Sequence, residues 1–123
     1  DALLKATGGC EWVEREELID VATAVSGSGP AYVFLLAEAL AEAGARAGLP
    51  ADMADRLARA TVAGAGELIA RTGIDPAQLR KNVTSPNGTT AAALNVLMAE
   101  DGLAPLLVRA VAAAKQRAEE LAG

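Results

Sequence analysis

The chain has 123 residues, the length of one ordinary domain and enough for a hydrophobic core of its own. It contains no histidine and a single cysteine, Cys10, which excludes a Ser-His triad, a histidine proton shuttle, an ordinary zinc site and an intrachain disulfide. A formal net charge of -5 argues against nucleic acid as a partner, because phosphate binding relies on clustered Lys and Arg.

The sequence gives no sign of a membrane protein. No stretch approaches the roughly 18 uninterrupted apolar residues of a membrane span, and the acidic start lacks the basic and then apolar form of a signal peptide. A lone cysteine agrees with a reducing compartment. We therefore expect a soluble, cytoplasmic protein.

Alanine dominates the apolar content. Hydrophobic residues make up 52% of the chain, but 30 of them are alanine, and the aromatic residues are Trp12, Tyr32 and Phe34. Alanine is the best helix former yet buries little surface, so close helix packing must replace bulky side chains, partly against a second copy of the chain. We expect an all-α domain, a bundle of about six helices, that associates with itself.

The first 15 residues differ from the rest. The run from Gly8 to Glu14 is broken by glycine and partly alternating, which is a weak strand or linker signal. A chain that opens on a strand is typical of the cut end of a preceding domain. We therefore divide the chain into 1–15, a remnant of a preceding domain or a linker, and 16–123, a helical domain.

Helical periodicity begins at Glu16 and is interrupted by Ser-Gly-Ser-Gly-Pro at 26–30. The interruption is also a start signal, because Ser28 or Gly29 can cap a new helix and Pro30 suits its first turn.

Start and stop signals place four more helices along the chain. Gly64 and Gly66 fall inside the first of them, where close helix crossing is favoured over a bend. The expected ranges are about 52–71, 76–82, 89–100 and 103–121.

Hydroxyls, a turn and a helix start are concentrated between Asn82 and Leu94. The run Ser-Pro-Asn-Gly at 85–88 predicts a turn, because proline fixes its own φ and Asn and Gly tolerate left-handed conformations. Thr89 and Thr90 stand before an alanine-rich helix whose start their hydroxyls can cap. The N–H donors and hydroxyls at such a helix start suit a carboxylate or a phosphate.

The residues alone leave several alternatives open. Segment 84–90 is either a capped turn or a ligand site, and segment 26–32 is either a turn between helices or a close approach of backbone to a ligand. Segment 26–32 is not G-x-G-x-x-G, because Tyr32 replaces the third glycine and a helix precedes it. Arg80 and Lys81 either steer an anion or are exposed helix charges, which we favour. No carboxylate pair or metal-binding cluster stands out.

Three motifs together resemble the C-terminal domain of pyrroline-5-carboxylate reductase in content, order and spacing. They are Ala-Val-Ser-Gly-Ser-Gly-Pro-Ala-Tyr at 24–32, Ala-Gly-Leu-Pro at 47–50, and the run at 79–94, which is similar to the signature of that family. The resemblance implies the helical C-terminal domain of a 6-phosphogluconate-dehydrogenase-like reductase, which forms an interlocked homodimer and sometimes a larger, decamer-like ring. In the family a Rossmann domain that binds NADPH or NADH precedes it.

The resemblance implies hydride transfer from the nicotinamide to the C=N carbon of 1-pyrroline-5-carboxylate, which gives L-proline. Ser85 and the backbone amides around Gly88, Thr89 and Thr90 would hold the substrate carboxylate. The Thr90 hydroxyl would meet the ring nitrogen and would be the catalytic group.

The resemblance also places Val83 and Thr84 on the nicotinamide side, with the 26–29 turn packed nearby. Many relatives have Gly where this chain has Asn87, and because Asn tolerates the left-handed region, the turn should persist. Since the chain has no Rossmann fingerprint, we expect a fragment that is inactive alone. The alternative is a stand-alone helical dimerisation module without catalytic activity.

Overall fold

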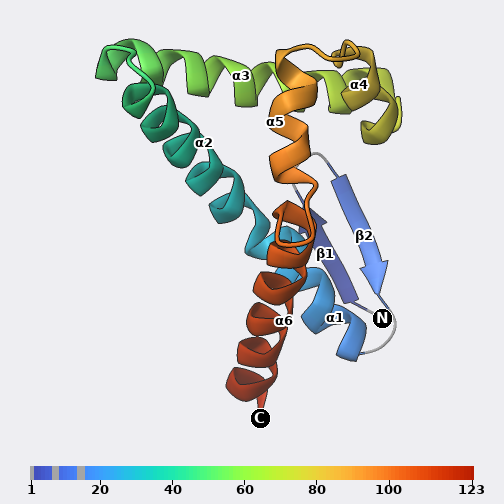
Figure 1. Cartoon of the computed structure of the whole chain (residues 1–123). Helices are drawn as coiled ribbons and strands as arrows, with labels where there is room; N and C mark the ends of the chain where they lie inside the picture. The colour runs from blue at the N-terminus through green and yellow to red at the C-terminus, as the bar shows by residue number, and fades with distance from the viewer. Residues whose placement is uncertain (1, 7–8, 14–15) are drawn as a thin grey trace. The chain divides into compact units, whose positions relative to one another are not determined.

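The computed structural model describes residues 2–6, 9–13 and 16–123, with side chains from residue 17 onward (Figure 1). The chain divides into two compact units, of which the first comprises Asp1–Ser28 and Ile74–Gly123 and the second Gly29–Gly73. The helices occupy most of the described residues, so the predicted all-α fold class is confirmed. A two-stranded hairpin precedes the first helix.

The hairpin belongs to the first unit. Strands β1 (Ala2–Ala6) and β2 (Gly9–Val13) pair antiparallel, with Leu3 opposite Trp12. The strand signal is thus confirmed for β2, while its end residues Gly8 and Glu14 lie outside the described residues. No strand was predicted for β1, because its sequence Ala-Leu-Leu-Lys-Ala does not alternate between apolar and polar residues.

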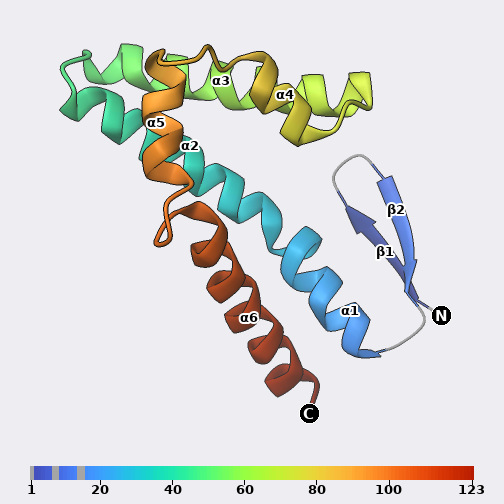
Figure 2. The same ribbon diagram turned by 45° about the vertical axis from the view of Figure 1, so that its right-hand side comes forward.

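Small side chains bring the helices of the first unit together. Helix α1 (Glu16–Ala22) and the π-helical segment η1 (Thr23–Gly27) both pack on α6 (Leu103–Ala122), as Figure 2 shows. Strand β1 contacts η1. Ala24, the second residue of η1, is 1% exposed. The alanine-based packing expected from the composition is therefore present at this contact.

The predicted interruption at 26–30 is shorter than expected, because helical structure continues from α1 through η1 to Gly27. The predicted helix start is confirmed, since α2 (Gly29–Arg46) begins after Ser28 with Pro30 in its first turn. The Ser28 N–H donates to the Thr23 carbonyl, five residues back, at 2.9 Å, so the widened π turn accommodates one extra residue. A widened turn also relieves the clash between the ring of Pro30 and a carbonyl of the preceding turn.

The second unit consists of α2 and α3 (Ala51–Thr72), which converge at the turn that joins them and diverge away from it (Figures 1 and 2). Ala54 and Ala58 on α3 are each 3% exposed. A Cβ atom added at Gly44 of α2 would lie 3.5 Å from the Cβ of Ala54 and 3.3 Å from the Cδ1 of Leu49. Gly44 therefore permits the close approach of these two helices.

Gly64 and Gly66 do not have the predicted role within this chain. No heavy atom of the described residues outside the local helix lies within 4 Å of a Cβ atom added at either glycine. Helix α3 continues through both positions to Thr72. Close crossing at these glycines is absent here because they face open space.

Large apolar side chains remain exposed on both units. Phe34 on α2 is 68% exposed and Val96 is 72% exposed. The helical stretch Glu17–Arg46 is long and apolar enough to cross a membrane, with a mean hydropathy of 1.3 in its best window, so the prediction that no stretch approaches a span is too strong. Core helices of soluble proteins pass the same test. Exposed apolar faces of this kind mark contact surfaces.

Two further helices of the first unit flank the segment of interest. Helix α4 (Pro76–Asn82) matches its prediction, and α5 (Thr89–Leu97) ends three residues early. After Leu97 the chain turns, with the Gly102 N–H donating to the Ala99 carbonyl at 2.9 Å. A Cβ atom at Gly102 would collide with the carbonyl oxygen of Leu97, so only glycine closes this turn.

Candidate functional site

A tight turn joins α4 to α5. The Gly88 N–H donates to the Ser85 carbonyl at 3.0 Å, and Asn87 has a φ of 60°. Proline at the second position and a positive φ at the third are the signature of a type II turn. The turn prediction is confirmed, as is the expectation that Asn87 adopts the left-handed conformation.

Gly88 fits closely against the start of the turn. A Cβ atom added there would lie 3.2 Å from the carbonyl oxygen of Ser85 and 3.4 Å from its Cβ atom. Its backbone is extended, with φ of -89° and ψ of -174°, a conformation that any residue can adopt. The small size of Gly88, rather than its backbone freedom, therefore suits it to this position.

The predicted capping by threonine hydroxyls is wrong. Gly88 is the N-cap residue of α5, and no side chain caps the helix. Thr89 and Thr90 are instead its first two helical residues. From those positions a hydroxyl cannot accept the first-turn N–H bonds that an N-cap side chain accepts, because it lies inside the turn rather than before it.

The first turn of α5 presents unused donors. In the part of the chain that the structure describes, no group accepts a hydrogen bond from the N–H of Thr89, Thr90 or Ala91. The first helical bond runs from the Ala92 N–H to the Gly88 carbonyl at 3.1 Å. Three N–H groups at the positive end of a helix make a suitable site for an anion.

Hydroxyl groups surround these donors. Ser85 and Thr89 are exposed and Thr90 is half-buried. None of the three hydroxyls has a hydrogen-bond partner within the described ranges. The cluster thus offers several uncommitted hydrogen-bonding groups beside the helix start.

On the α4 side, the two residues before the turn differ in their contacts. The Thr84 hydroxyl donates to the Arg80 carbonyl at 2.6 Å, and the Thr84 N–H donates to the Lys81 carbonyl at 3.1 Å. Val83, the C-cap residue of α4, is 67% exposed. Val83 therefore presents an apolar surface, whereas the hydroxyl hydrogen of Thr84 is already engaged.

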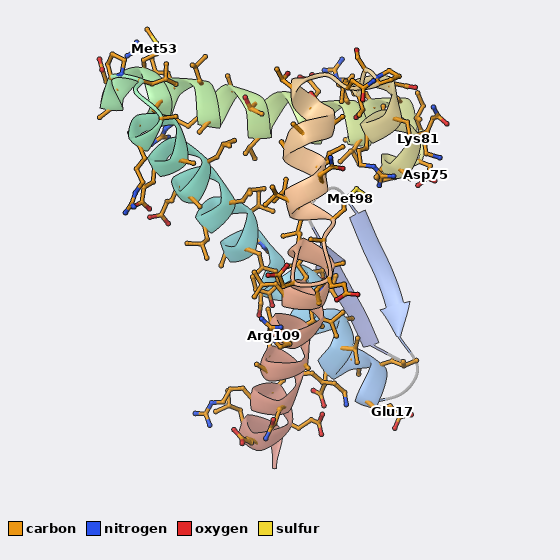
Figure 3. The ribbon with its side chains drawn as sticks, in the orientation of Figure 1. Glu17, Met53, Asp75, Lys81, Met98 and Arg109 are labelled. Carbon is orange, nitrogen blue, oxygen red and sulfur yellow. The ribbon has the colours of Figure 1, made fainter. Side chains whose placement is uncertain are left out.

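Two cations lie on the last turn of α4. Lys81 is exposed, as Figure 3 shows, and Arg80 is half-buried. Neither forms an ion pair with another residue that the structure describes. The interpretation of exposed helix charges is thus confirmed for Lys81 and holds only partly for Arg80.

All the predicted site residues fall within one short segment of the first unit, 83–90. The sequence did not single out Ala91, whose N–H becomes a donor once the helix start is fixed at Gly88. Two cavities, of about 430 and 410 Å³, lie instead between α2 and α3 in the second unit. In this single chain the 83–90 segment lines neither cavity, so its N–H donors remain accessible to a ligand or to a partner chain.

The comparisons agree on one family. The model of pyrroline-5-carboxylate reductase dimerisation matches residues 16–121. A pyrroline-5-carboxylate reductase of Pseudomonas aeruginosa is 48% identical over 120 residues, which cover 98% of this chain and 44% of that protein.

Two solved structures are similar in fold. A pyrroline-5-carboxylate reductase from Coxiella burnetii has a TM-score of 0.83 and 45% identity, covering 89% of this chain and 40% of that one. A pyrroline carboxylate reductase of Plasmodium falciparum, solved with NADP bound, has a TM-score of 0.80 and 34% identity. The match covers 89% of this chain and 42% of that one.

The present chain thus spans less than half the length of these relatives. The match nevertheless covers nearly all of this chain and extends over every helix that the structure describes. It includes the type II turn and the start of α5. The chain belongs to the pyrroline-5-carboxylate reductase dimerisation family.

Proposed function

We propose that this chain is the dimerisation and substrate-binding part of an enzyme that reduces 1-pyrroline-5-carboxylate to L-proline. The observation that carries the proposal is the start of α5, where a type II turn presents three unused N–H groups. Relatives that are 44 to 48% identical to this chain, the Pseudomonas aeruginosa protein among them, are pyrroline-5-carboxylate reductases. A reductase of this substrate needs a site for one carboxylate.

The substrate carboxylate is assigned to the N–H groups of Thr89, Thr90 and Ala91. These donors point out of the first turn of a nine-residue helix, where the partial positive charge of the helix adds to each hydrogen bond. The Ser85 hydroxyl completes the binding group, and Gly88 contributes through its small size, because its N–H already donates to the Ser85 carbonyl. A carboxylate can be held in this way without a buried arginine.

The ring nitrogen is assigned to the hydroxyl of Thr90. Reduction adds a hydride to the C=N carbon and a proton to the nitrogen, so the nitrogen changes from an acceptor to a donor. A hydroxyl can donate to the imine nitrogen and later accept from the amine N–H, because it has both a hydrogen and lone pairs. Thr90 is therefore the catalytic residue of the proposal, acting mainly by orientation.

NADPH or NADH supplies the hydride when it is bound. Among the described residues of the segment, Val83 offers the exposed apolar surface that a nicotinamide ring can lie against, with Thr84 beside it. We assign the rest of cofactor binding to a separate Rossmann domain, to which 1–15 would be the connection or terminal remnant. The greater length of the relatives supports this division.

The proposed protein is a homodimer, with a decamer-like ring as its larger assembly, and it is cytoplasmic. The family is described by its dimerisation, and the exposed apolar faces of α2 and α5 are the surface expected of such a chain. Partner helices would also supply the walls that the open 83–90 segment lacks.

A chimera tests the proposal. The cofactor-binding part of the Pseudomonas aeruginosa reductase is fused to this chain in place of its own matching part, and NADPH oxidation is followed with 1-pyrroline-5-carboxylate. We expect turnover by the chimera and none by this chain alone. A folded, dimeric chimera without turnover would instead favour a helical dimerisation module that has no catalytic role.

A further inference from the structure

We infer that Thr84 is a positioning residue, which fixes the substrate turn to the end of α4 through its hydroxyl group. The inference rests on the proposed function, because the turn matters only if it holds the substrate. It gives Thr84 a different role from the one that the resemblance implies, which is to line the nicotinamide side.

Thr84 is bound to the last turn of α4 at two points. Its hydroxyl donates to the Arg80 carbonyl at 2.6 Å and its N–H donates to the Lys81 carbonyl at 3.1 Å. The Arg80 carbonyl also accepts from the Val83 N–H at 3.3 Å. Thr84 is half-buried and directly precedes the turn, so these bonds determine where the turn begins.

The hydroxyl also changes the electrostatics of the site. The last carbonyls of a helix carry partial negative charge and lack helical partners. One type II turn separates those carbonyls from the donors that would hold the substrate carboxylate. By donating to the Arg80 carbonyl, Thr84 reduces the negative potential that an anion would meet on this side.

Two substitutions separate these effects from simple packing. Thr84→Val keeps the shape of the side chain but removes the hydroxyl, whereas Thr84→Ser keeps the hydroxyl. In the chimera we expect Thr84→Val to raise the KM for 1-pyrroline-5-carboxylate roughly fivefold, the value of one net hydrogen bond, with kcat changed less than about twofold. Thr84→Ser should recover most of the lost affinity.

Thr61 offers a matched control. Its hydroxyl donates to the Leu57 carbonyl at 2.7 Å, the same bond four residues back, but inside α3 of the second unit. Thr61→Val therefore removes an equivalent bond without touching the turn. We expect its KM to stay within about twofold of the unmodified chimera.

A second readout does not depend on catalysis. In this chain alone, amide hydrogen exchange at Gly88, whose N–H closes the turn, should become several-fold faster in Thr84→Val and not in Thr61→Val. Unchanged exchange at Gly88, or an unchanged KM in an active chimera, would overturn the role of Thr84. An inactive unmodified chimera with faster Gly88 exchange would instead reject the proposed function and retain the anchoring of the turn.

Discussion

Two segments of this chain combine serine, glycine and proline, yet they fold differently. At 85–88 the chain makes a type II turn, whereas at 26–30 it remains helical through a π-helical turn. The difference lies in the neighbouring groups. Asn87 takes a positive φ, which a right-handed helix cannot contain. The Ser26 hydroxyl instead donates to the Ala22 carbonyl at 2.8 Å, so Ser26 remains within the helix.

The comparison shows how a turn becomes a site. A π-helical turn keeps its N–H groups occupied, as the Ser28 bond to the Thr23 carbonyl illustrates. A type II turn that leads into a helix leaves the N–H groups of the next turn without partners. Of the two segments, therefore, the turn at 85–88 with the helix start that follows it is the one that offers N–H donors to a ligand.

The largest expected effect concerns Thr90 in the active chimera. Thr90→Ala should lower kcat/KM for 1-pyrroline-5-carboxylate tenfold or more, because loss of one hydrogen bond made in the transition state costs about 1.5–3 kcal/mol. Steady-state kinetics give the value, and Thr61→Ala is the control. Unchanged kinetics in Thr90→Ala would remove Thr90 from the site.

The next-largest expected effect concerns the backbone conformation of the turn at 85–88. Asn87→Val should destabilise the chain by about 1–2 kcal/mol, since a β-branched residue is strained at positive φ. Asn87→Gly is the control and should be at least as stable as the natural chain. Urea unfolding at one fixed chain concentration measures both, and equal midpoints for Val and Gly would mean that the turn does not need the left-handed residue.

The corresponding test of the π-helical turn is Ser26→Ala. Removing the hydroxyl that donates to the Ala22 carbonyl should cost about 1 kcal/mol in the same unfolding experiment. Ser28→Ala is matched to it, because Ser28 contributes its backbone N–H, which alanine retains. Should both variants unfold alike, the Ser26 bond would have no part in stabilising this turn.

The smallest effect concerns the charge of Lys115 on α6. The Glu119 carboxylate, 3.0 Å from the Lys115 ammonium, raises the pKa of Lys115 above 10.5, and Asp20 and Glu17 add to it. Since the folded pKa is the higher one, the charged lysine stabilises the fold fully below pH 10.5, and the contribution is lost as pH rises through the folded pKa.

Thermal unfolding of Lys115→Met beside the natural chain measures this contribution. The small difference in Tm seen near neutral pH should shrink as the pH rises above 10.5. A difference that persists at high pH would show that Lys115 acts through its packing rather than its charge.

The sequence predicted the positions of α4 and α6 and the turn at 85–88 closely, because proline, asparagine and glycine have strong local preferences. It did not predict η1, since a π turn shifts a helical period by one residue without changing which residues are apolar.

Other errors came from tertiary geometry. Threonine hydroxyls were assigned to the N-cap position, which Gly88 occupies, because a sequence does not fix which residue is the first helical one. Close approach was assigned to Gly64 and Gly66 rather than to Gly44, since which face of α3 meets α2 depends on the connecting turn. The unused N–H donors depend on the exact residue at which α5 begins, so only the structure identifies them.

A crystal structure of the chimera with L-proline tests the assignment of the carboxylate most directly. We expect the proline carboxylate to accept hydrogen bonds from the N–H groups of Thr89, Thr90 and Ala91 at about 2.7–3.2 Å, with the amine beside the Thr90 hydroxyl. Proline bound elsewhere, or its carboxylate held by a lysine or arginine instead of these amides, would contradict the assignment.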